Sequence, residues 1–243
     1  KHVFARHQPK YHPYQLLKMP FSDAVDYLLH RSMGSIAFLI ETQVFTRTCE
    51  FARLFGVDFY SVLSRGSQFK VESLMLRLGH LESFFFFSPG KQDVVKMRAP
   101  ECLQLIMEPE GQFYVDPIVV LDYQSLYPSV MIAYNYCFST CIGRSAEPFP
   151  RHLGVQSAFD QRSIGRNLDE DSILSSVNRV SFVKKNVREG LLSKMLTELL
   201  DARIKIKVKM SQAEDLVEKR VLDARQLGIK FILNVTYGYT AAS

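Results

Sequence analysis

The pattern of apolar and polar positions predicts helical segments on both sides of one strand-like segment. Apolar residues recur at helical spacing in residues 23–40 and again in residues 49–55, where Gly56 marks the end of the helix. Residues 59–78 carry further apolar repeats on both sides of a turn at residues 65–67. The first third of the chain is therefore expected to hold two helices and at least one turn.

The strand-like segment is residues 118–121, four apolar residues of which three are β-branched. Such a run predicts a buried strand, and Asp122 follows directly at its end. A polar turn with Tyr127 and Pro128 comes next, and the apolar residues after it indicate a helix. A carboxylate at a strand end can hold a hard cation such as Mg²⁺, or it can simply cap the following turn or helix. The local pattern leaves both interpretations of Asp122 open.

The C-terminal part predicts two antiparallel helices joined by a short polar tip at residues 211–215. In the first helix, apolar residues recur at helical spacing over residues 191–200. Residues 203–209 alternate like a strand, but no turn residue separates them from this repeat, so we expect one continuing helix. The second helix is expected over residues 221–237, and it is apolar on almost every side.

One polar stripe interrupts the apolar surface of this second helix. Gln226, Lys230, Asn234 and Tyr237 follow one another at intervals of four, four and three residues, which places them on one face. A polar stripe on a largely buried helix faces a partner, a cleft or the solvent, and the spacing does not decide among these. Gly238, directly after the stripe, is expected to end the helix or to allow a close approach.

Composition and charge narrow the class of partner. The chain has 243 residues, enough for one large domain or two small ones, and a formal net charge of +5. Residues 184–230 hold 12 Lys/Arg and 7 Asp/Glu, a net charge of +5. This segment therefore carries all of the excess positive charge, and the rest of the chain is neutral. This distribution is typical of an element that faces phosphate groups. The four cysteines lack the spacing of a zinc site, which favours buried thiols in a reducing compartment.

Two further segments limit the possible architectures. Residues 123–143 are 21 residues without a charge, long enough to span a membrane, but their polar residues and Pro128 favour a buried strand–turn–helix unit. We therefore expect no membrane association. Residues 144–180 are rich in polar and turn residues, and we expect a loop-rich insertion there.

A nucleoside triphosphate with Mg²⁺ would use the strand-end carboxylate, the basic helical pair and the polar stripe together. Asp122 would hold the metal on the phosphate oxygens, while Arg203 and Lys230 would neutralise the phosphates. Tyr127 and Tyr237 offer flat surfaces for a sugar and a base.

Two motifs resemble those of family B DNA polymerases. Residues 122–129, Asp-Tyr-Gln-Ser-Leu-Tyr-Pro-Ser, resemble motif A, and residues 230–238, Lys-Phe-Ile-Leu-Asn-Val-Thr-Tyr-Gly, resemble motif B. Both occur in the family's order, with a basic helical hairpin between them. Five further stretches narrow the resemblance to the zeta branch, the eukaryotic translesion polymerases; they are residues 47–56, 63–73, 97–109, 133–143 and 223–228.

The resemblance implies a role for each matching position. Asp122 is implied to be one of two palm carboxylates that bind both catalytic Mg²⁺ ions, with the main-chain carbonyl of Tyr123 as a further ligand. The implied nucleotide-binding residues are Leu126, Tyr127, Arg203, Lys230, Asn234, Tyr237 and Gly238. Among these, Tyr127 would lie under the sugar as a steric gate and Tyr237 under the nascent base pair, while the cations and Asn234 would contact the triphosphate.

The same resemblance implies an α/β (α+β) fold that is a fragment of a right-hand polymerase. Residues 1–45 would end an inactive exonuclease-like domain, and residues 46–97 would form a connecting helical segment. The palm, with motif A and an insertion, would begin in residues 98–182, and the fingers hairpin with motif B would occupy residues 183–243. Ser22 stands where the family's exonuclease motif has a tyrosine, so no proofreading site is expected.

The implied activity is template-directed DNA synthesis, in which a nucleotide is transferred from a dNTP to a primer 3′-OH, and in this branch translesion synthesis. Primer–template DNA and accessory polymerase subunits are the implied partners, the nucleus is the implied location, and an iron–sulfur cluster is implied in a C-terminal region outside these residues. The family's second metal carboxylate follows motif B beyond Ser243, so the fragment alone is expected to be inactive. The alternative is a non-catalytic nucleic-acid-binding module or a degenerate polymerase scaffold, which explains the basic segment but not the motif residues.

Overall fold

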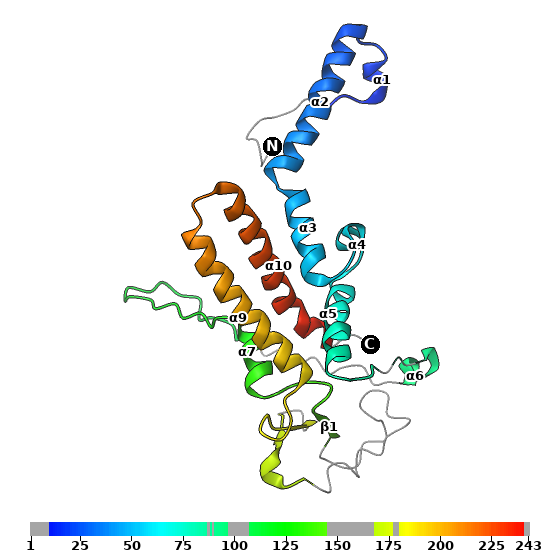
Figure 1. Cartoon of the computed structure of the whole chain (residues 1–243). Coiled ribbons are helices and arrows are strands. Elements are labelled where there is room, and N and C mark those ends of the chain that lie inside the picture. The colour runs from blue at the N-terminus through cyan, green and yellow to red at the C-terminus, as the bar shows by residue number, and fades with distance from the viewer. Residues whose placement is uncertain are drawn as a thin grey trace.

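The computed structural model describes residues 10–86, 88, 90–96, 107–144, 168–176 and 180–240, and these residues are mostly helical (Figure 1). The helices are α1 (Pro13–Leu16), α2 (Phe21–Glu41), α3 (Val44–Phe55), α4 (Phe59–Ser64), α5 (Ser67–Leu81), α6 (Lys91–Lys96), α7 (Leu126–Ala133), α9 (Leu191–Gln212) and α10 (Leu216–Thr240). Helices α1 and α2 extend away from the others, and α9 and α10 form a long antiparallel hairpin (Figure 1).

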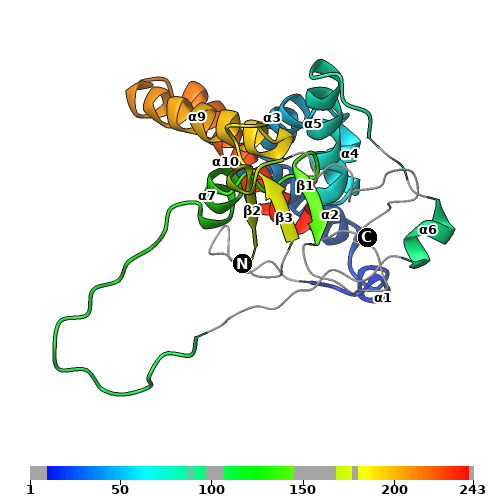
Figure 2. The same ribbon diagram turned by 90° about the horizontal axis from the view of Figure 1, so that it is seen from below.

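A small antiparallel sheet lies near the start of α9 (Figure 2). Its strands are β1 (Cys141–Arg144), β2 (Ile173–Ser175) and β3 (Val180–Val183), in the order β1-β3-β2, and the short 3₁₀ helix η1 (Glu170–Ser172) leads into β2. Phe182 of β3 is paired with Cys141 on one side and with Leu174 on the other. The described residues therefore form a mixed fold of many helices and one small sheet, as expected for the α+β class.

The hairpin confirms the helical interpretation of the C-terminal part. Residues 203–209 continue α9 despite their strand-like alternation, and residues 213–215 form the tip before α10 begins. The expectation for Gly238 is wrong, because α10 runs through it to Thr240 and no atom lies within 4 Å of the position a Cβ would take there. Tyr239 packs against the core directly after this glycine, so burial of its ring continues the helix.

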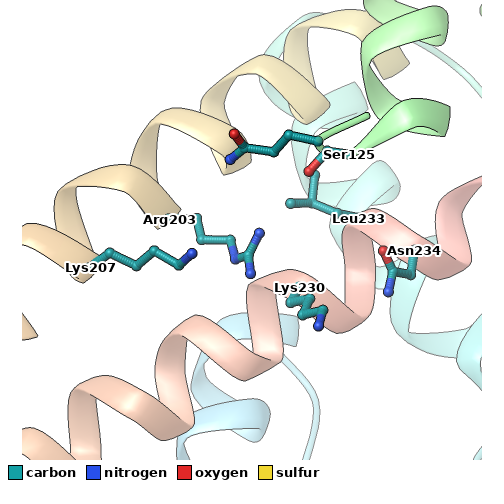
Figure 3. A pocket seen from close by; sticks show the side chains of 7 residues that line it. Ser125, Arg203, Lys207, Lys230, Leu233 and Asn234 are labelled. Carbon is teal, nitrogen blue, oxygen red and sulfur yellow. The ribbon is translucent and has the colours of Figure 1, made fainter. Parts of the chain in front are cut away.

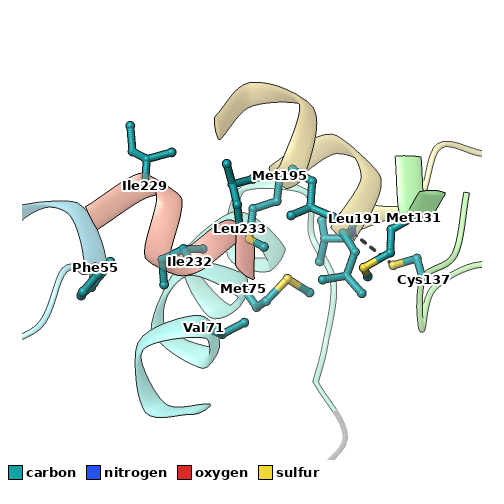
Figure 4. Close-up of a cluster of buried hydrophobic side chains, with 12 residues drawn as sticks. Phe55, Val71, Met75, Met131, Cys137, Leu191, Met195, Ile229, Ile232 and Leu233 are labelled. Carbon is teal, nitrogen blue, oxygen red and sulfur yellow. Dashed lines mark hydrogen bonds between the residues drawn. The ribbon is translucent and has the colours of Figure 1, made fainter. Parts of the chain in front are cut away.

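Helix α10 is the central element of the core. It packs against α9, and it also packs against α3 and α5. The buried hydrophobic cluster draws side chains from these four helices and from the region of α7 (Figure 4). Its members are Phe55, Val71, Met75, Met131, Cys137, Leu191, Leu192, Met195, Leu196, Ile229, Ile232 and Leu233. Removal of these apolar surfaces from water is the main force that holds α10 in place.

Two side chains of α5 hold the C-terminal end of α3. Gly56 ends α3 in the left-handed conformation, with a φ of 65°. The hydroxyl of Ser73 donates to the main-chain oxygen of Phe55 at 2.7 Å, and the guanidinium of Arg77 donates to that of Leu54 at 2.9 Å. These bonds satisfy carbonyl groups that a helix end leaves without an intrahelical partner. Helices α3 and α5 thus form one support for α10.

The side chain of Asn135 ties the segment after α7 to the residues that precede α9. Its amide nitrogen donates to the carbonyl oxygens of Val183 and Arg188, each at 2.8 Å, and its Oδ1 accepts from the N–H of Gly190 at 2.8 Å. Asn135 is 1% exposed and has a φ of 57°, a left-handed conformation that asparagine adopts more readily than most residues. At Gly190 a Cβ would lie 2.7 Å from the Cβ of Cys137. The main chain before α9 can therefore approach Cys137 this closely only with a glycine at position 190.

The first turn of α9 is fixed to the same segment by further hydrogen bonds. The N–H of Leu191 donates to the hydroxyl of Ser139 at 3.2 Å, and the N–H of Leu192 donates to the sulfur of Cys137 at 3.2 Å. These N–H groups have no partner within the helix, so the segment after α7 acts as a cap for α9.

The expected buried strand at residues 118–121 is wrong. Residues 107–125 contain no helix or strand and loop out from the helices (Figures 1 and 2). The side chains of Val119, Val120 and Leu121 are 78%, 86% and 91% exposed. A strand needs neighbouring strands to pair its N–H and C=O groups, and no strand of the described residues pairs with this segment.

The uncharged residues 123–143 fold as a turn, the eight-residue helix α7, a second turn and the start of β1. The expected helix is confirmed, but the turn before it lies at residues 124–125, and Tyr127 and Pro128, which were expected in the turn, belong to the first turn of α7. No helix in the described part of the chain is long and apolar enough to cross a membrane.

Much of the insertion expected at residues 144–180 lies outside the described residues. Of the cysteines, Cys137 is buried as expected, but Cys49 is exposed on α3, and Cys102 lies outside the described residues.

We predict that Asn135→Ala lowers the free energy of unfolding of the 243-residue chain by about 2–4 kcal/mol, because three main-chain groups, two of them in buried hydrogen bonds, lose their partner at once. Asn186→Ala is the matched control, since Asn186 is exposed, and its effect should stay within about 0.5 kcal/mol. Urea unfolding followed by circular dichroism measures both values. Equal effects of the two substitutions would show that the Asn135 bonds do not hold the start of α9.

Candidate anion-binding pocket

A pocket of about 410 Å³ lies between α9, α10 and the residues that precede α7 (Figure 3). Three segments contribute the side chains that line it: Arg203 and Lys207 from α9, Lys230, Leu233 and Asn234 from α10, and Gln124 and Ser125 from the turn before α7. Among the described residues that line the pocket, three are cations and none is a carboxylate. The pocket therefore concentrates positive charge and favours an anion.

Arg203 places a buried donor in the pocket wall. Its Nε is shielded from solvent and has no hydrogen-bond partner among the described residues. A buried polar group without a partner costs about 1–3 kcal/mol, and native structures rarely leave one in that state. The guanidinium that carries this group lines the pocket and offers several N–H donors in one plane, which suits phosphate oxygens.

Lys207 lies one helical turn beyond Arg203 on the same face of α9. Both side chains reach toward α10, which carries Lys230 one turn before Asn234 (Figure 3). The pocket thus has cations on both of its helical walls. Such an arrangement suits several linked phosphate groups better than a single carboxylate, because the charges are spread along the pocket.

Two polar residues of the pocket lining, Asn234 and Ser125, are positioned by their neighbours in the chain. Leu233 is 2% exposed and belongs to the core, which fixes its neighbour Asn234 at the surface. Ser125 precedes α7 with a φ of 55°, and this left-handed residue turns the chain at the pocket wall.

Tyr127 and Tyr237 form a stacked pair that joins α7 to α10. Their ring centroids are 4.7 Å apart and the rings are inclined by 18°. The side chains remain 54% and 42% exposed. The structure thus brings these two predicted residues together, and each ring covers one face of the other, so their outer faces are the ones open to a ligand.

The remaining predicted residues lie outside the pocket lining. Asp122 and Tyr123 are exposed in the irregular segment that leads into α7, and the carboxylate of Asp122 makes no ion pair or hydrogen bond with the described residues. Leu126 is 48% exposed, and Gly238 faces open space. No group of three or more His, Cys, Asp or Glu side chains that could hold a metal ion occurs among the residues the structure describes.

Three predicted residues, Arg203, Lys230 and Asn234, therefore meet in one pocket, where Lys207, Gln124 and Ser125 join them without having been predicted. Lys207 has a signal in the sequence, because it follows Arg203 by four residues on a continuing helix. Gln124 and Ser125 have no comparable signal, since their place depends on how the turn before α7 meets α9.

Comparisons with known proteins add an independent line of information. The sequence model of DNA polymerase family B matches residues 57–243. The chain is 44% identical over 240 residues to the DNA polymerase zeta catalytic subunit of Arabidopsis thaliana, covering 95% of this chain and 13% of that protein. It is 48% identical over 229 residues to the DNA polymerase zeta catalytic subunit of Drosophila melanogaster, covering 90% of this chain and 10% of that protein. The chain thus spans only about a tenth of the length of these curated relatives.

A solved structure shows the same fold. The family B DNA polymerase of the hyperthermophilic archaeon Pyrobaculum calidifontis aligns with 93% of this chain and 26% of its own chain, with a TM-score of 0.59. Its sequence identity of 19% limits the likeness to the fold.

We predict that Lys207→Ala weakens the binding of inorganic tripolyphosphate to the chain by about tenfold, because one charge-assisted hydrogen bond is lost from the pocket wall. Lys205→Ala is the matched control: it removes the same charge from the same helix, but Lys205 does not line the pocket. Isothermal titration calorimetry at fixed ionic strength measures both constants. Equal weakening in the two variants would mean that the affinity for the anion depends on the net charge of α9 and not on the pocket.

Proposed function

Because the chain belongs to DNA polymerase family B, we propose that the pocket between α9 and α10 binds the triphosphate of an incoming deoxynucleotide during template-directed DNA synthesis. The observation that carries this proposal is the convergence of Arg203, Lys207 and Lys230 on one pocket, in which the buried Nε of Arg203 has no acceptor among the described residues. Three cations complement the charge of a triphosphate, and Asn234 adds an amide that can bind a phosphate oxygen.

In the proposed reaction the primer 3′-oxygen forms a bond to the α-phosphorus of the nucleotide. The bond from that phosphorus to its bridging oxygen breaks, and pyrophosphate leaves with the electron pair, while the hydroxyl proton passes to a base. Negative charge grows on the leaving pyrophosphate as this bond breaks. Arg203, Lys207 and Lys230 would hold that group in place and stabilise its charge, so their contribution is positioning and electrostatics.

Family B polymerases generally use divalent metal ions, and the chain offers oxygen donors of the right kind for Mg²⁺. The carboxylate of Asp122 has no partner among the described residues, and the main-chain carbonyl of Tyr123 is its neighbour. These two donors fit an ion that also takes phosphate oxygens, but they do not by themselves complete the ligands of two ions. When bound, Mg²⁺ supplies charge stabilisation at the phosphate oxygens and activates the attacking hydroxyl. We assign Asp122 the role of catalytic metal ligand.

The aromatic pair would contact the rest of the nucleotide. Tyr127, with Leu126 beside it, would lie under the sugar, and Tyr237, with Gly238, would lie under the nascent base pair. The stacking of the two rings supports this assignment, because it holds both at the junction of α7 and α10, next to the residues that line the pocket.

The resemblance to family B polymerases supports a proposed role for each subdomain. Residues 1–45 would end an inactive exonuclease-like domain, residues 46–97 would connect it to the palm, residues 98–182 would begin the palm, and residues 183–243 would form the fingers. The similarity to zeta catalytic subunits supports translesion synthesis as the activity of the whole protein, with primer–template DNA and accessory polymerase subunits as partners in the nucleus.

We predict that Asp122→Asn reduces primer extension by a polymerase that contains these 243 residues by about a hundredfold or more, because a neutral amide is a poor ligand for Mg²⁺. Asp116→Asn is the matched control, since Asp116 is exposed in the same irregular segment, and it should keep the rate of the unsubstituted enzyme. The measurement is single-nucleotide extension of a labelled primer at saturating dNTP.

An unchanged rate for Asp122→Asn would contradict the metal role. If the unsubstituted protein binds primer–template DNA but extends no primer at all, the alternative of a non-catalytic nucleic-acid-binding module replaces the proposed function.

A further inference from the structure

One side of α10 makes a continuous contact with α3. The guanidinium Nε of Arg225 donates to the carboxylate of Glu50 at 2.8 Å. One turn later, at Gly228, a Cβ would lie 3.0 Å from the ring of Phe51, so the two helices approach closely there. The ring of Phe231 follows, with its centroid 6.3 Å from that of Phe51. We call this contact of Arg225, Gly228 and Phe231 with α3 the seam.

Glu50 is the only charged group of the seam among the described residues that is almost fully buried. Its side chain is 5% exposed, whereas that of Arg225 is 42% exposed. Its two oxygens have different partners: Oε2 accepts from Arg225 on α10, and Oε1 accepts from Arg53 at 3.2 Å on its own helix. A buried carboxylate is stable only when its partners stay in place. The ion pair therefore holds α10 at one position along α3 and at one rotation about its own axis.

The seam and the pocket lie on different sides of the same helix. Phe231 of the seam directly follows Lys230 of the pocket, and Gly228 precedes it by two residues. A rotation or shift of α10 on α3 would therefore carry Lys230 and Asn234 with it. The start of α9 is held separately, by hydrogen bonds from the segment after α7, so such a movement would change the position of α10 relative to that end of α9. The relative position of the two pocket walls thus depends on the seam.

We propose that Glu50 is a positioning residue for the anion pocket, which through Arg225 holds α10 where Lys230 and Asn234 face Arg203 and Lys207. The proposal assigns no contact between Glu50 and the nucleotide, and its functional meaning rests on the triphosphate role of the pocket. The Glu50–Arg225 ion pair lies outside the pocket. Its proposed role adds to the triphosphate role of the pocket the interaction that keeps the two pocket walls in position.

The test compares tripolyphosphate binding by the 243-residue chain and by variants of the ion pair. Glu50→Gln and Arg225→Gln should each weaken binding by about tenfold, because a displacement of one pocket wall by about 1 Å is enough to lose well-placed contacts. The double variant should be no weaker than either single variant, since both remove the same interaction. Arg225→Lys keeps the charge and should restore most of the affinity.

Two controls separate positioning from loss of stability. Arg53→Gln removes the partner of the other Glu50 oxygen without touching α10, and its effect should stay below about twofold, because Arg53 is 77% exposed. Val62→Ala removes buried volume from α4, and it should lower the melting temperature without weakening tripolyphosphate binding by folded protein.

The outcomes distinguish this inference from the proposed function. If the unsubstituted chain does not bind tripolyphosphate, the pocket itself is wrong. If it binds, but Glu50→Gln and Arg225→Gln bind equally well, Glu50 does not position the pocket. Should Glu50→Gln fail to fold, the comparison of Arg225→Gln with Arg225→Lys decides, and equal affinity of these two would overturn the proposal.

Discussion

The side-chain amide of Asn135 is the interaction on which the arrangement of the pocket depends. It joins a turn after α7 to three main-chain groups that lie 48 to 55 residues further along the chain. Because the amide is buried and uses both its donor and its acceptor, it allows one relative position of these segments. That position sets where α9 begins. Because the helix is rigid, the position of its first turn also sets the positions of Arg203 and Lys207.

The opposite wall of the pocket is held by a different kind of contact. Helix α10 is fixed on α3 and α5 by hydrophobic packing, with the Glu50–Arg225 pair as its polar component. Each of the two helices that line the pocket thus has an anchor of its own, in addition to the packing of α9 against α10. Beyond the pocket, the start of α10 at the hairpin tip has exposed apolar residues, Leu216 and Val217. Anchored walls with a projecting tip suit a site that must hold several phosphates in fixed geometry.

Local pattern predicts the longest helices, because each carries its own repeat of apolar residues. Apolar spacing predicted α2 and the hairpin, and the lack of a turn residue correctly outweighed the strand-like alternation at residues 203–209. Motifs A and B indicated family B, which the family match confirms. The strand at residues 118–121 was wrong, because a strand depends on partners that local sequence does not contain. Likewise, nothing near Asn135 or Glu50 reveals a partner dozens of residues away, so the anchors of the pocket were not predictable.

The triphosphate role of the pocket is tested most directly by Lys230→Ala in a polymerase that contains these 243 residues, with nucleotide and DNA binding measured on the same preparation. The side chain of Lys230 lines the pocket, so its loss should raise the KM for dNTP by about tenfold or more, as expected for one charge-assisted contact. The Kd for primer–template DNA should change by less than about twofold, because a contact to the nucleotide leaves the DNA contacts intact. Weaker DNA binding with an unchanged KM for dNTP would contradict the assignment of this pocket to the nucleotide.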